Sequence, residues 1–347
     1  MSPADPLSPL DERLARALAP ALDTATGPVL LAVSGGPDST ALMHAAAIRG
    51  ARTTPFVATV DHGLRAASAE EAAQVGRLAA RLGLPHAILT WETQRRDGRI
   101  QAEARAARYR LLSRHAESIG ADRILTAHTR DDQAETVLMR LLAGSGPAGL
   151  AGMRPERPLS DGLRLVRPFL GLAKADLVAY CAAHALPFVS DPSNADERFA
   201  RARLRRLLPL LEGEGLSIAR LARLATRLAR DEAALAARAA TVFGEVRIGK
   251  VGEGLMLDGR RLAREPEAIV LRVVDAALDA VAQGGDGEPA PKRLERLESL
   301  VLDGILPALA RTEPLRRTLR GTIVGVGPSG RIRLTPAPQR RPAEPRK

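Results

Sequence analysis

The segment SGGPDS, residues 34–39, combines residue types that suit a phosphorylated ligand. Two adjacent glycines let the backbone turn tightly and approach a ligand closely. If a helix follows, its free N–H groups and positive dipole end favour phosphate, and Pro37 suits its first turn. Ser34 and Ser39 add hydroxyls, and Asp38 fits a magnesium ion carried by a nucleotide. The chain contains no Gly-Lys-Ser/Thr motif, so the segment is not a Walker loop.

A second group of reactive side chains lies in TAHTRDDQAET, residues 126–136. Glu135 follows Asp131 by four residues and Asp132 by three, so either pair can share a helix face. Carboxylates beside a nucleotide can hold magnesium or a cationic amine. As an alternative, acids in a first helical turn complement the helix dipole, with Thr129 as the cap. That alternative explains why Asp131 and Asp132 occur at a helix start. It does not explain their expected position opposite residues 34–39, which we call the phosphate loop.

The elements that position these residues alternate between short apolar runs and helical patterns. We predict strands over residues 29–34, 55–61, 86–91 and 123–128, and helices over residues 39–48, 68–82, 100–119 and 131–143. This pattern is typical of βαβ units, and it predicts an α/β fold with a parallel, Rossmann-like sheet covered on both faces. Ligands bind such sheets at the carboxyl ends of the strands. Ser34, His62 and His128 follow three of these strands, so we expect one shared crevice.

The remaining segments predict further organisation. Residues 144–158 are rich in glycine and proline and are expected to be loop. We predict a small α+β module with strands over 255–257, 322–326 and 332–334 and helices over 266–282 and 292–302. The predicted domains are an N-terminal extension or helix (1–27), a catalytic domain (28–215), a linker helix (216–242), the C-terminal module (243–335) and a disordered tail (336–347).

Charge and composition narrow the class of protein. The 347 residues carry a formal net charge of +11, and only four of the 51 basic residues are lysines, namely Lys174, Lys250, Lys292 and Lys347. Such an excess of arginine indicates an acidic partner, most commonly nucleic acid, although a GC-rich genome also enriches arginine. Aromatic residues make up only 2%, which disfavours a stacking platform for single strands. The single cysteine, Cys181, excludes an intrachain disulfide and fits a cytoplasmic location. We expect no membrane span and no obligate protein partner.

The SGGPDS loop after a first strand resembles the pyrophosphate loop of the N-type ATP pyrophosphatases, which adenylate a carbonyl oxygen and release pyrophosphate. Over residues 28–210 the chain resembles, more narrowly, the tRNA(Ile)-lysidine synthase family. The segments that carry this resemblance are SGGPDS, VDHGLR (60–65), ARAARYRLL (104–112), TAHTRDDQAET, LLAGSGPAGLAGM (141–153) and DPSNADERFARARLRRLLP (191–209).

The resemblance implies a reaction. Members of the family use ATP to adenylate the C2 oxygen of the wobble cytidine in the CAU anticodon of tRNA(Ile). The ε-amine of free lysine then displaces AMP and gives lysidine. The resemblance implies catalytic roles for Asp38, Asp132 and Glu135, with Asp38 on the magnesium of Mg-ATP and the other two beside lysine. The implied ATP-binding residues are Ser34, Gly35, Gly36, Pro37, Asp38, Ser39, His62 and Arg108.

An arginine cluster at residues 198–206 is expected to contact tRNA phosphates, which position an RNA without reading its sequence. Its members are Arg198, Arg201, Arg203, Arg205 and Arg206. A solvated helix face is the alternative for this cluster, and surface packing is the alternative for Arg108 and Tyr109. Arg65 and Arg105 match segments that line the family's site. Two positions depart from the family pattern: Thr129 stands where a second histidine is usual, and Ala202 stands where an asparagine is usual.

Three other functions fit the sequence less well. A tRNA thiolase needs a persulfide or cluster and hence several cysteines, but this chain has one. A GMP synthetase needs a source of ammonia, and no glutaminase-like domain is evident. A non-catalytic tRNA-binding relic would have no need to keep Asp38, Asp132 and Glu135 together.

Overall fold

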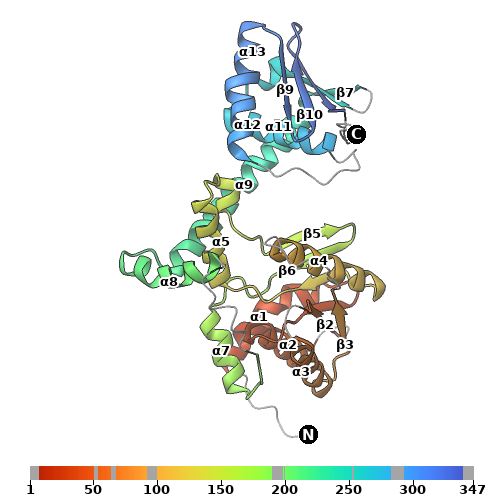
Figure 1. The fold of residues 1–347 in the computed structure, drawn as a ribbon, viewed down its shortest axis with the longest axis vertical. Coiled ribbons are helices and arrows are strands. Elements are labelled where there is room, and N and C mark those ends of the chain that lie inside the picture. Colours follow the sequence, from red (N-terminus) through yellow and green to blue (C-terminus); the bar gives the residue numbers. More distant parts are fainter. Residues whose placement is uncertain are drawn as a thin grey trace, which may run out of the picture. The chain divides into compact units, whose positions relative to one another are not determined.

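The computed structural model describes residues 8–50, 54–63, 68–91, 100–189, 198, 200–251, 254–282 and 293–338. The chain divides into two compact units (Figure 1). Unit 1 comprises Met1–Gly144 and Gly149–Thr226, and unit 2 comprises Ser145–Ala148 and Arg227–Lys347. The division falls within helix α9, Ile218–Val246, where the linker helix was expected. Within the described residues, we find no helix with the length and apolar character needed to span a membrane.

Unit 1 is built on a six-stranded sheet with the order β3-β2-β1-β4-β6-β5. All neighbouring strands are parallel except the edge strand β5, which runs antiparallel to β6. The strands are β1 (Val29–Ala32), β2 (Phe56–Asp61), β3 (His86–Thr90), β4 (Arg123–Leu125), β5 (Glu156–Ser160) and β6 (Leu163–Val166). The helices of the unit before α9 are α1 (Pro9–Asp23), α2 (Pro37–Arg49), α3 (Ser68–Arg81), α4 (Ile100–Ser118), α5 (Arg130–Leu142), α7 (Lys174–Ala183) and α8 (Ala200–Gly213). The short helix α6 (Pro147–Leu150) is divided between the two units.

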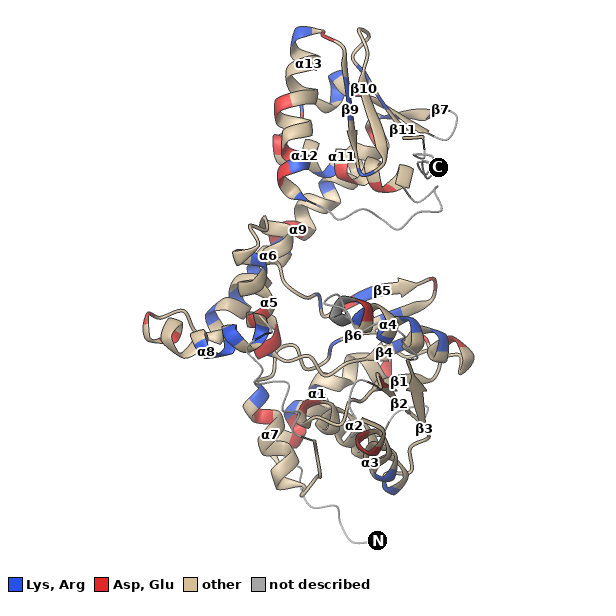
Figure 2. Ribbon diagram, viewed as in Figure 1, with Lys and Arg blue, Asp and Glu red and all other residues tan. Residues whose placement is uncertain are grey.

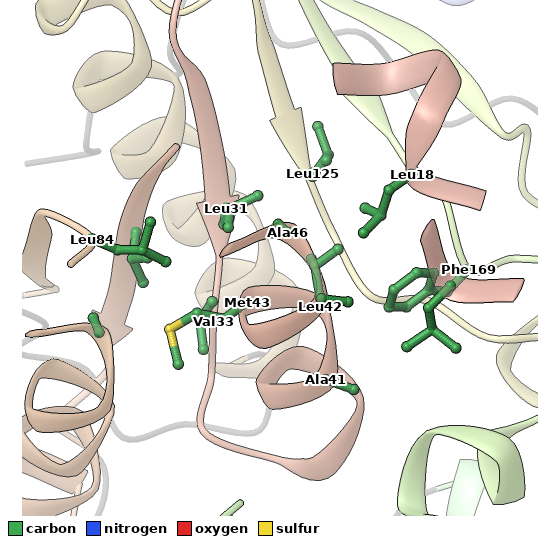
Figure 3. Packing of buried hydrophobic residues seen from close by; sticks show 14 of the residues in the cluster. Leu18, Leu31, Val33, Ala41, Leu42, Met43, Ala46, Leu84, Leu125 and Phe169 are labelled. Carbon is green, nitrogen blue, oxygen red and sulfur yellow. The ribbon is translucent and has the colours of Figure 1, made fainter. Parts of the chain in front are cut away.

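The alternating side chains of β1 explain the layers on its two faces. Leu31 and Val33 pack with Leu42 and Met43 of α2, in a core that also includes residues of α1, α3 and α7 (Figure 3). Leu30 and Ala32 point into the other layer, where they meet α4. Because β1 is buried on both faces, its sequence is continuously apolar, as the parallel-sheet prediction requires. Helix α1, expected as an extension, contributes fully buried residues to the first core.

The strands and helices predicted before residue 144 agree with β1–β4 and α2–α5 to within a few residues. The predicted α/β fold is confirmed, but the sheet is not wholly parallel. The segment expected as loop contains α6 and the start of β5, and β6 and α7 were not predicted. Strand β5 was missed because it is an edge strand containing Pro158, a residue that sheets tolerate mainly at their edges.

Unit 2 contains a five-stranded antiparallel sheet with the order β7-β8-β11-β10-β9. Its strands are β7 (Arg247–Val251), β8 (Gly254–Asp258), β9 (Leu315–Leu319), β10 (Thr322–Val326) and β11 (Arg331–Pro336). Its helices beyond α9 are α10 (Gly259–Leu262), α11 (Glu267–Ala282), α12 (Leu294–Leu300), the π-helix Val301–Ile305 and α13 (Leu306–Arg311). The apolar side of α11 packs on the sheet. Strand β11 includes Pro336, so the tail does not begin where predicted, and residues 339–347 lie outside the described residues.

Candidate active site

The loop between β1 and α2 has a conformation that depends on its residue types. Gly35 has a φ of +86°, and a Cβ there would lie 3.2 Å from the Val75 side chain. The Ser39 hydroxyl accepts a hydrogen bond from the Ser34 N–H at 3.1 Å and donates to the Gly36 carbonyl at 3.1 Å. Pro37 begins α2, as expected. The loop therefore presents a helix N-terminus at the carboxyl end of β1.

A hollow of about 120 Å³ lies at this edge of the sheet. Its lining residues are Ala32, Ser34, Gly36, Asp38, Ser39, Arg108, Thr126, Ala127, His128 and Asp132. The structure thus brings together residues from the ends of two strands, β1 and β4, and from α4. The end of β2, which was expected to share this crevice, contributes no lining residue. Gly35, Pro37, His62 and Glu135 are not among the lining residues, although the first two belong to the loop itself.

Asp38 is paired on one oxygen only. Its Oδ2 accepts a hydrogen bond from Lys174 Nζ at 2.6 Å, while its buried Oδ1 has no partner among the described residues. Burial raises the pKa of Asp38, and Lys174 opposes that rise. An unpartnered carboxylate oxygen is a ligand that magnesium prefers, so Asp38 fits the metal of a magnesium nucleotide.

Lys174, at the start of α7, is a site residue that was not predicted from the sequence. Its backbone N–H also donates to Asp131 Oδ2 at 2.9 Å. Lys174 therefore contacts both the SGGPDS loop, through Asp38, and the start of α5, through Asp131. The phosphate loop has no lysine of its own, and α7 brings one to it. A signal was present in the sequence, because Lys174 is the only lysine before residue 250.

Asp132 and Glu135 lie on α5 with different partners. Thr129 caps this helix: Asp132 Oδ2 accepts from the Thr129 N–H at 2.8 Å and from its hydroxyl at 2.9 Å. Asp132 also lines the hollow. The same carboxylate can therefore take part in the cap of α5 and face a ligand in the hollow. Glu135 is only 2% exposed and accepts from Arg205 at 2.5 and 3.3 Å. Burial raises the pKa of Glu135, and the Arg205 guanidinium opposes that rise.

The arginines expected to contact tRNA lie on and just before α8, where Figure 2 shows basic residues gathered. Arg198, Arg203 and Arg206 are exposed, and Arg201 and Arg205 are partly buried. Arg205 differs from the others because its guanidinium is directed at Glu135. Apolar residues of α8, including Leu204 and Leu208, pack against α5, which places the two helices side by side.

Histidines follow β2 and β4. His62 packs edge-on against Trp91 at 5.8 Å, and its buried Nδ1 has no partner among the described residues. Burial lowers the pKa of His128 to about 3, opposed by Asp132 and reinforced by Arg108, Arg167 and Arg105. His128 is therefore neutral at pH 7. Arg65 lies outside the described residues.

The structure shows where the two residues that depart from the family pattern, Thr129 and Ala202, are located. Thr129 is the cap of α5, and Ala202 is buried in α8. The lone cysteine, Cys181, is also buried, and its thiol donates to the Pro37 carbonyl at 3.3 Å. Burial raises the pKa of this thiol to about 11.

Comparison with known proteins decides the family. The model of the PP-loop domain family matches residues 7–211. A tRNA(Ile)-lysidine synthase of Methylobacterium sp. (strain 4-46) is 57% identical over 342 residues, covering 97% of this chain and 98% of that one. This chain belongs to the tRNA(Ile)-lysidine synthase family. The resemblance drawn from its sequence is confirmed.

More distant relatives support the same assignment. A tRNA(Ile)-lysidine synthase of Bradyrhizobium sp. (strain BTAi1) is 44% identical, with 94% of each chain covered. Among solved structures, a U34-tRNA thiolase from Methanococcus maripaludis, described with its [4Fe-4S] cluster, has a TM-score of 0.55 and 15% identity. That match covers 64% of this chain and 78% of the thiolase, and it shows a shared fold.

Proposed function

We propose that this enzyme joins free lysine to C2 of the wobble cytidine in the CAU anticodon of tRNA(Ile). The C2 oxygen attacks the α-phosphorus of ATP, and the bond to the β-phosphate breaks to release pyrophosphate. The lysine ε-amine then attacks C2, the C2–O bond breaks, and AMP leaves with that oxygen. The observation that carries the proposal is the hollow itself, which combines the phosphate loop, Asp38 and Asp132 in a chain that belongs to this family.

ATP is the nucleotide substrate of a PP-loop enzyme, and the loop residues suit its phosphates. Ser34, Gly36 and Ser39 line the hollow beside the N-terminus of α2, where N–H groups and the helix dipole favour anions. Arg108 faces the same hollow and supplies positive charge. Asp38 would hold the magnesium carried by ATP through its unpartnered oxygen. When bound, magnesium supplies stabilisation of negative charge on the phosphates.

The lysine substrate fits the acidic side of the site. A cationic amine in a partly buried position needs fixed carboxylates. Asp132 is held by the cap of α5 and Glu135 by Arg205, so the orientation of both carboxylates is fixed. These acids can bind the ε-ammonium and accept the proton that the amine must lose before it attacks. Lysine binding beside Glu135 also has to accommodate Arg205.

The tRNA is assigned to two basic regions. Exposed arginines of α8 suit phosphates of the anticodon loop, which is single-stranded, so a base can leave its stack without breaking a duplex. Unit 2 contains a hollow of about 530 Å³ lined by Ile248, Asp258, Arg260, Arg261, Arg264, Ser329 and Arg331. We assign this arginine-rich module to the body of the tRNA, and the reaction to the cytoplasm, where that substrate is found.

The buried cysteine argues against thiolase chemistry. A sulfur-transfer enzyme needs an accessible thiolate, because the thiolate is the nucleophile. Cys181 is buried, donates to a backbone carbonyl, and has a raised pKa. Among the described residues, no group of three or more cysteine, histidine or acidic side chains is placed to hold a metal ion.

The proposal is tested with ATP, magnesium, labelled lysine and an unmodified transcript of tRNA(Ile) with a CAU anticodon. We expect label in the RNA with one AMP and one pyrophosphate per lysine attached. A transcript whose wobble cytidine is replaced by uridine is the matched control and should take up no label. If a preparation that binds ATP and tRNA attaches no lysine, the proposal is wrong.

A further inference from the structure

A group of arginines surrounds Tyr109 on the side of unit 1 formed by α4, β5 and the end of β6. The guanidinium carbons of Arg105 and Arg157 lie 5.3 Å and 5.4 Å from the centre of the Tyr109 ring, within the range of a cation–π contact. Burial lowers the pKa of Arg167, and the nearby Tyr109 side chain opposes that shift. We call Arg105, Tyr109, Arg157 and Arg167 the basic cluster. Figure 2 shows basic residues along α4 and β5 in this region.

Arg167 is the unusual member of the basic cluster. It is 4% exposed, and its Nη1 donates to the Arg154 carbonyl at 2.6 Å. Its buried Nε has no partner in the described part of the chain. Among the described residues, neither Arg167 nor Arg105 nor Arg157 has a carboxylate within ion-pair distance. A buried charge is normally compensated by an opposite charge, because its desolvation is costly. The basic cluster therefore lacks a counter-charge in the described part of the protein.

The basic cluster adjoins the nucleotide hollow through α4. Arg108 lines the hollow, Tyr109 is the next residue along the helix, and Arg105 lies about one turn before Arg108. The cluster reaches the surface as well, since Arg105 is exposed and Arg157 is partly buried. An anion that binds here can thus extend from solvent toward the position where the base is adenylated.

The chemistry of the basic cluster favours RNA over the triphosphate of ATP. The phosphate loop and α2 already offer N–H groups and hydroxyls to the nucleotide. An aromatic ring flanked by guanidinium groups suits an unpaired nucleotide, because guanidiniums bind phosphates and planar groups contact bases of any identity. The base to be modified must reach the α-phosphate, so its own flanking phosphates come close to the hollow.

We propose that the basic cluster binds the phosphodiester groups flanking the target base in the single-stranded loop of the tRNA. Arg105 and Arg157 contact the phosphates, and the buried Arg167 is a positioning residue that adds positive charge beside Tyr109. This inference rests on the proposed function, because it takes the RNA loop as the substrate of the same site.

The test compares Arg157→Gln with Arg164→Gln. Arg164 lies on the paired strand β6 and is the matched control, because its 57% exposed side chain is ion-paired with Glu156. The readouts are the Kd for a CAU anticodon stem–loop at several salt concentrations and the KM for ATP. We expect Arg157→Gln to weaken RNA binding about five- to tenfold and to reduce the slope of log K against log salt by about 0.7, the value for one lost contact to a single strand. Arg164→Gln should change neither readout.

Two results would overturn the inference. One is an RNA affinity of Arg157→Gln equal to that of Arg164→Gln; the other is a raised ATP KM with unchanged RNA binding, which would assign the basic cluster to the triphosphate. If Arg157→Gln does not fold, Arg105→Gln on the exposed side of α4 carries the same expectation. Failure of the proposed function looks different, since the wild-type protein would then attach no lysine whatever the variants do to RNA binding.

Discussion

Three acids of the candidate site and the arginines of the basic cluster are partnered in opposite ways. Asp38 pairs with Lys174, Asp132 with the cap of α5, and Glu135 with Arg205. The arginines of the basic cluster have no carboxylate partner among the described residues. Two of the three acids thus already accommodate a cation supplied by the protein, whereas the basic cluster carries charge that a ligand has to balance. This difference is the basis for our proposal that lysine binds on the acidic side and the RNA on the basic side.

The largest expected effect is at Asp38. Asp38→Asn should reduce pyrophosphate formation about 10²–10³-fold, the loss typical when one preorganised electrostatic group is removed. Burial raises the pKa of Asp38, so its ionised form is disfavoured by the fold, and the variant should keep or raise the Tm. Pyrophosphate release and thermal unfolding are the measurements. A variant that loses activity together with several degrees of Tm would show that Asp38 acts structurally.

The next effect separates the two roles of Asp132. Asp132→Asn should raise the KM for lysine about tenfold, because an amide cannot balance an ammonium ion. Thr129→Ala is the matched control: it removes the cap hydroxyl, which costs about 1 kcal/mol of stability, but it keeps the carboxylate. Its KM for lysine should stay unchanged. If the KM for lysine rises equally in the two variants, Asp132 acts only as part of the helix cap and does not bind lysine.

A smaller effect concerns the ion pair between the two helices. Arg205→Gln leaves Glu135 buried and unpaired, and we expect a loss of about 1–2 kcal/mol at pH 7, below the cost for a fully buried pair because Arg205 is 35% exposed. Arg205 holds the pKa of Glu135 down, so that pKa rises further in the variant. Glu135 then protonates at a higher pH, and the stability deficit should shrink as the pH falls from 7 to 5.

Denaturant unfolding at pH 7 and pH 5 measures this change. Arg206→Gln, an exposed position on the same helix, should show no such dependence on pH. A deficit for Arg205→Gln that stays constant between the two pH values would contradict the assignment of the pair.

The smallest effect lies in unit 2. Arg260→Gln removes one charge from the arginine-lined hollow and should weaken binding of full-length tRNA(Ile) about two- to threefold, since it loses one of several phosphate contacts. Binding of the isolated anticodon stem–loop should stay the same. Equal weakening of both RNAs would contradict the assignment of unit 2 to the body of the tRNA.

The sequence predicted the parts of unit 1 whose signals are local. Continuous apolar runs marked the central strands, and the glycines and Pro37 marked the turn into α2. The edge hairpin escaped prediction because Pro158 and charged residues interrupt its alternation. Lys174 escaped because its partner, Asp38, is 136 positions away, and no local pattern reports such a contact.

The partners of the charged side chains could not be predicted from the sequence either. Arg205 was grouped with its neighbours on α8, but only the packing of α8 against α5 turns it toward Glu135. The basic cluster combines one helix with a hairpin that was not predicted, so Tyr109 and Arg105 gave no sign of Arg157 and Arg167. In both cases long-range packing, and not spacing along the chain, decides the electrostatics.

The most direct test of the two-sided site is a crossed measurement of KM. Glu135→Gln and Arg157→Gln are each assayed for lysine attachment with lysine varied at saturating tRNA and with tRNA varied at saturating lysine. We predict that Glu135→Gln raises the KM for lysine about tenfold and leaves that for tRNA unchanged, and that Arg157→Gln does the reverse. If both variants raise the same KM, or if the two variants have equal KM values for lysine and for tRNA, the division into an acidic and a basic side is wrong.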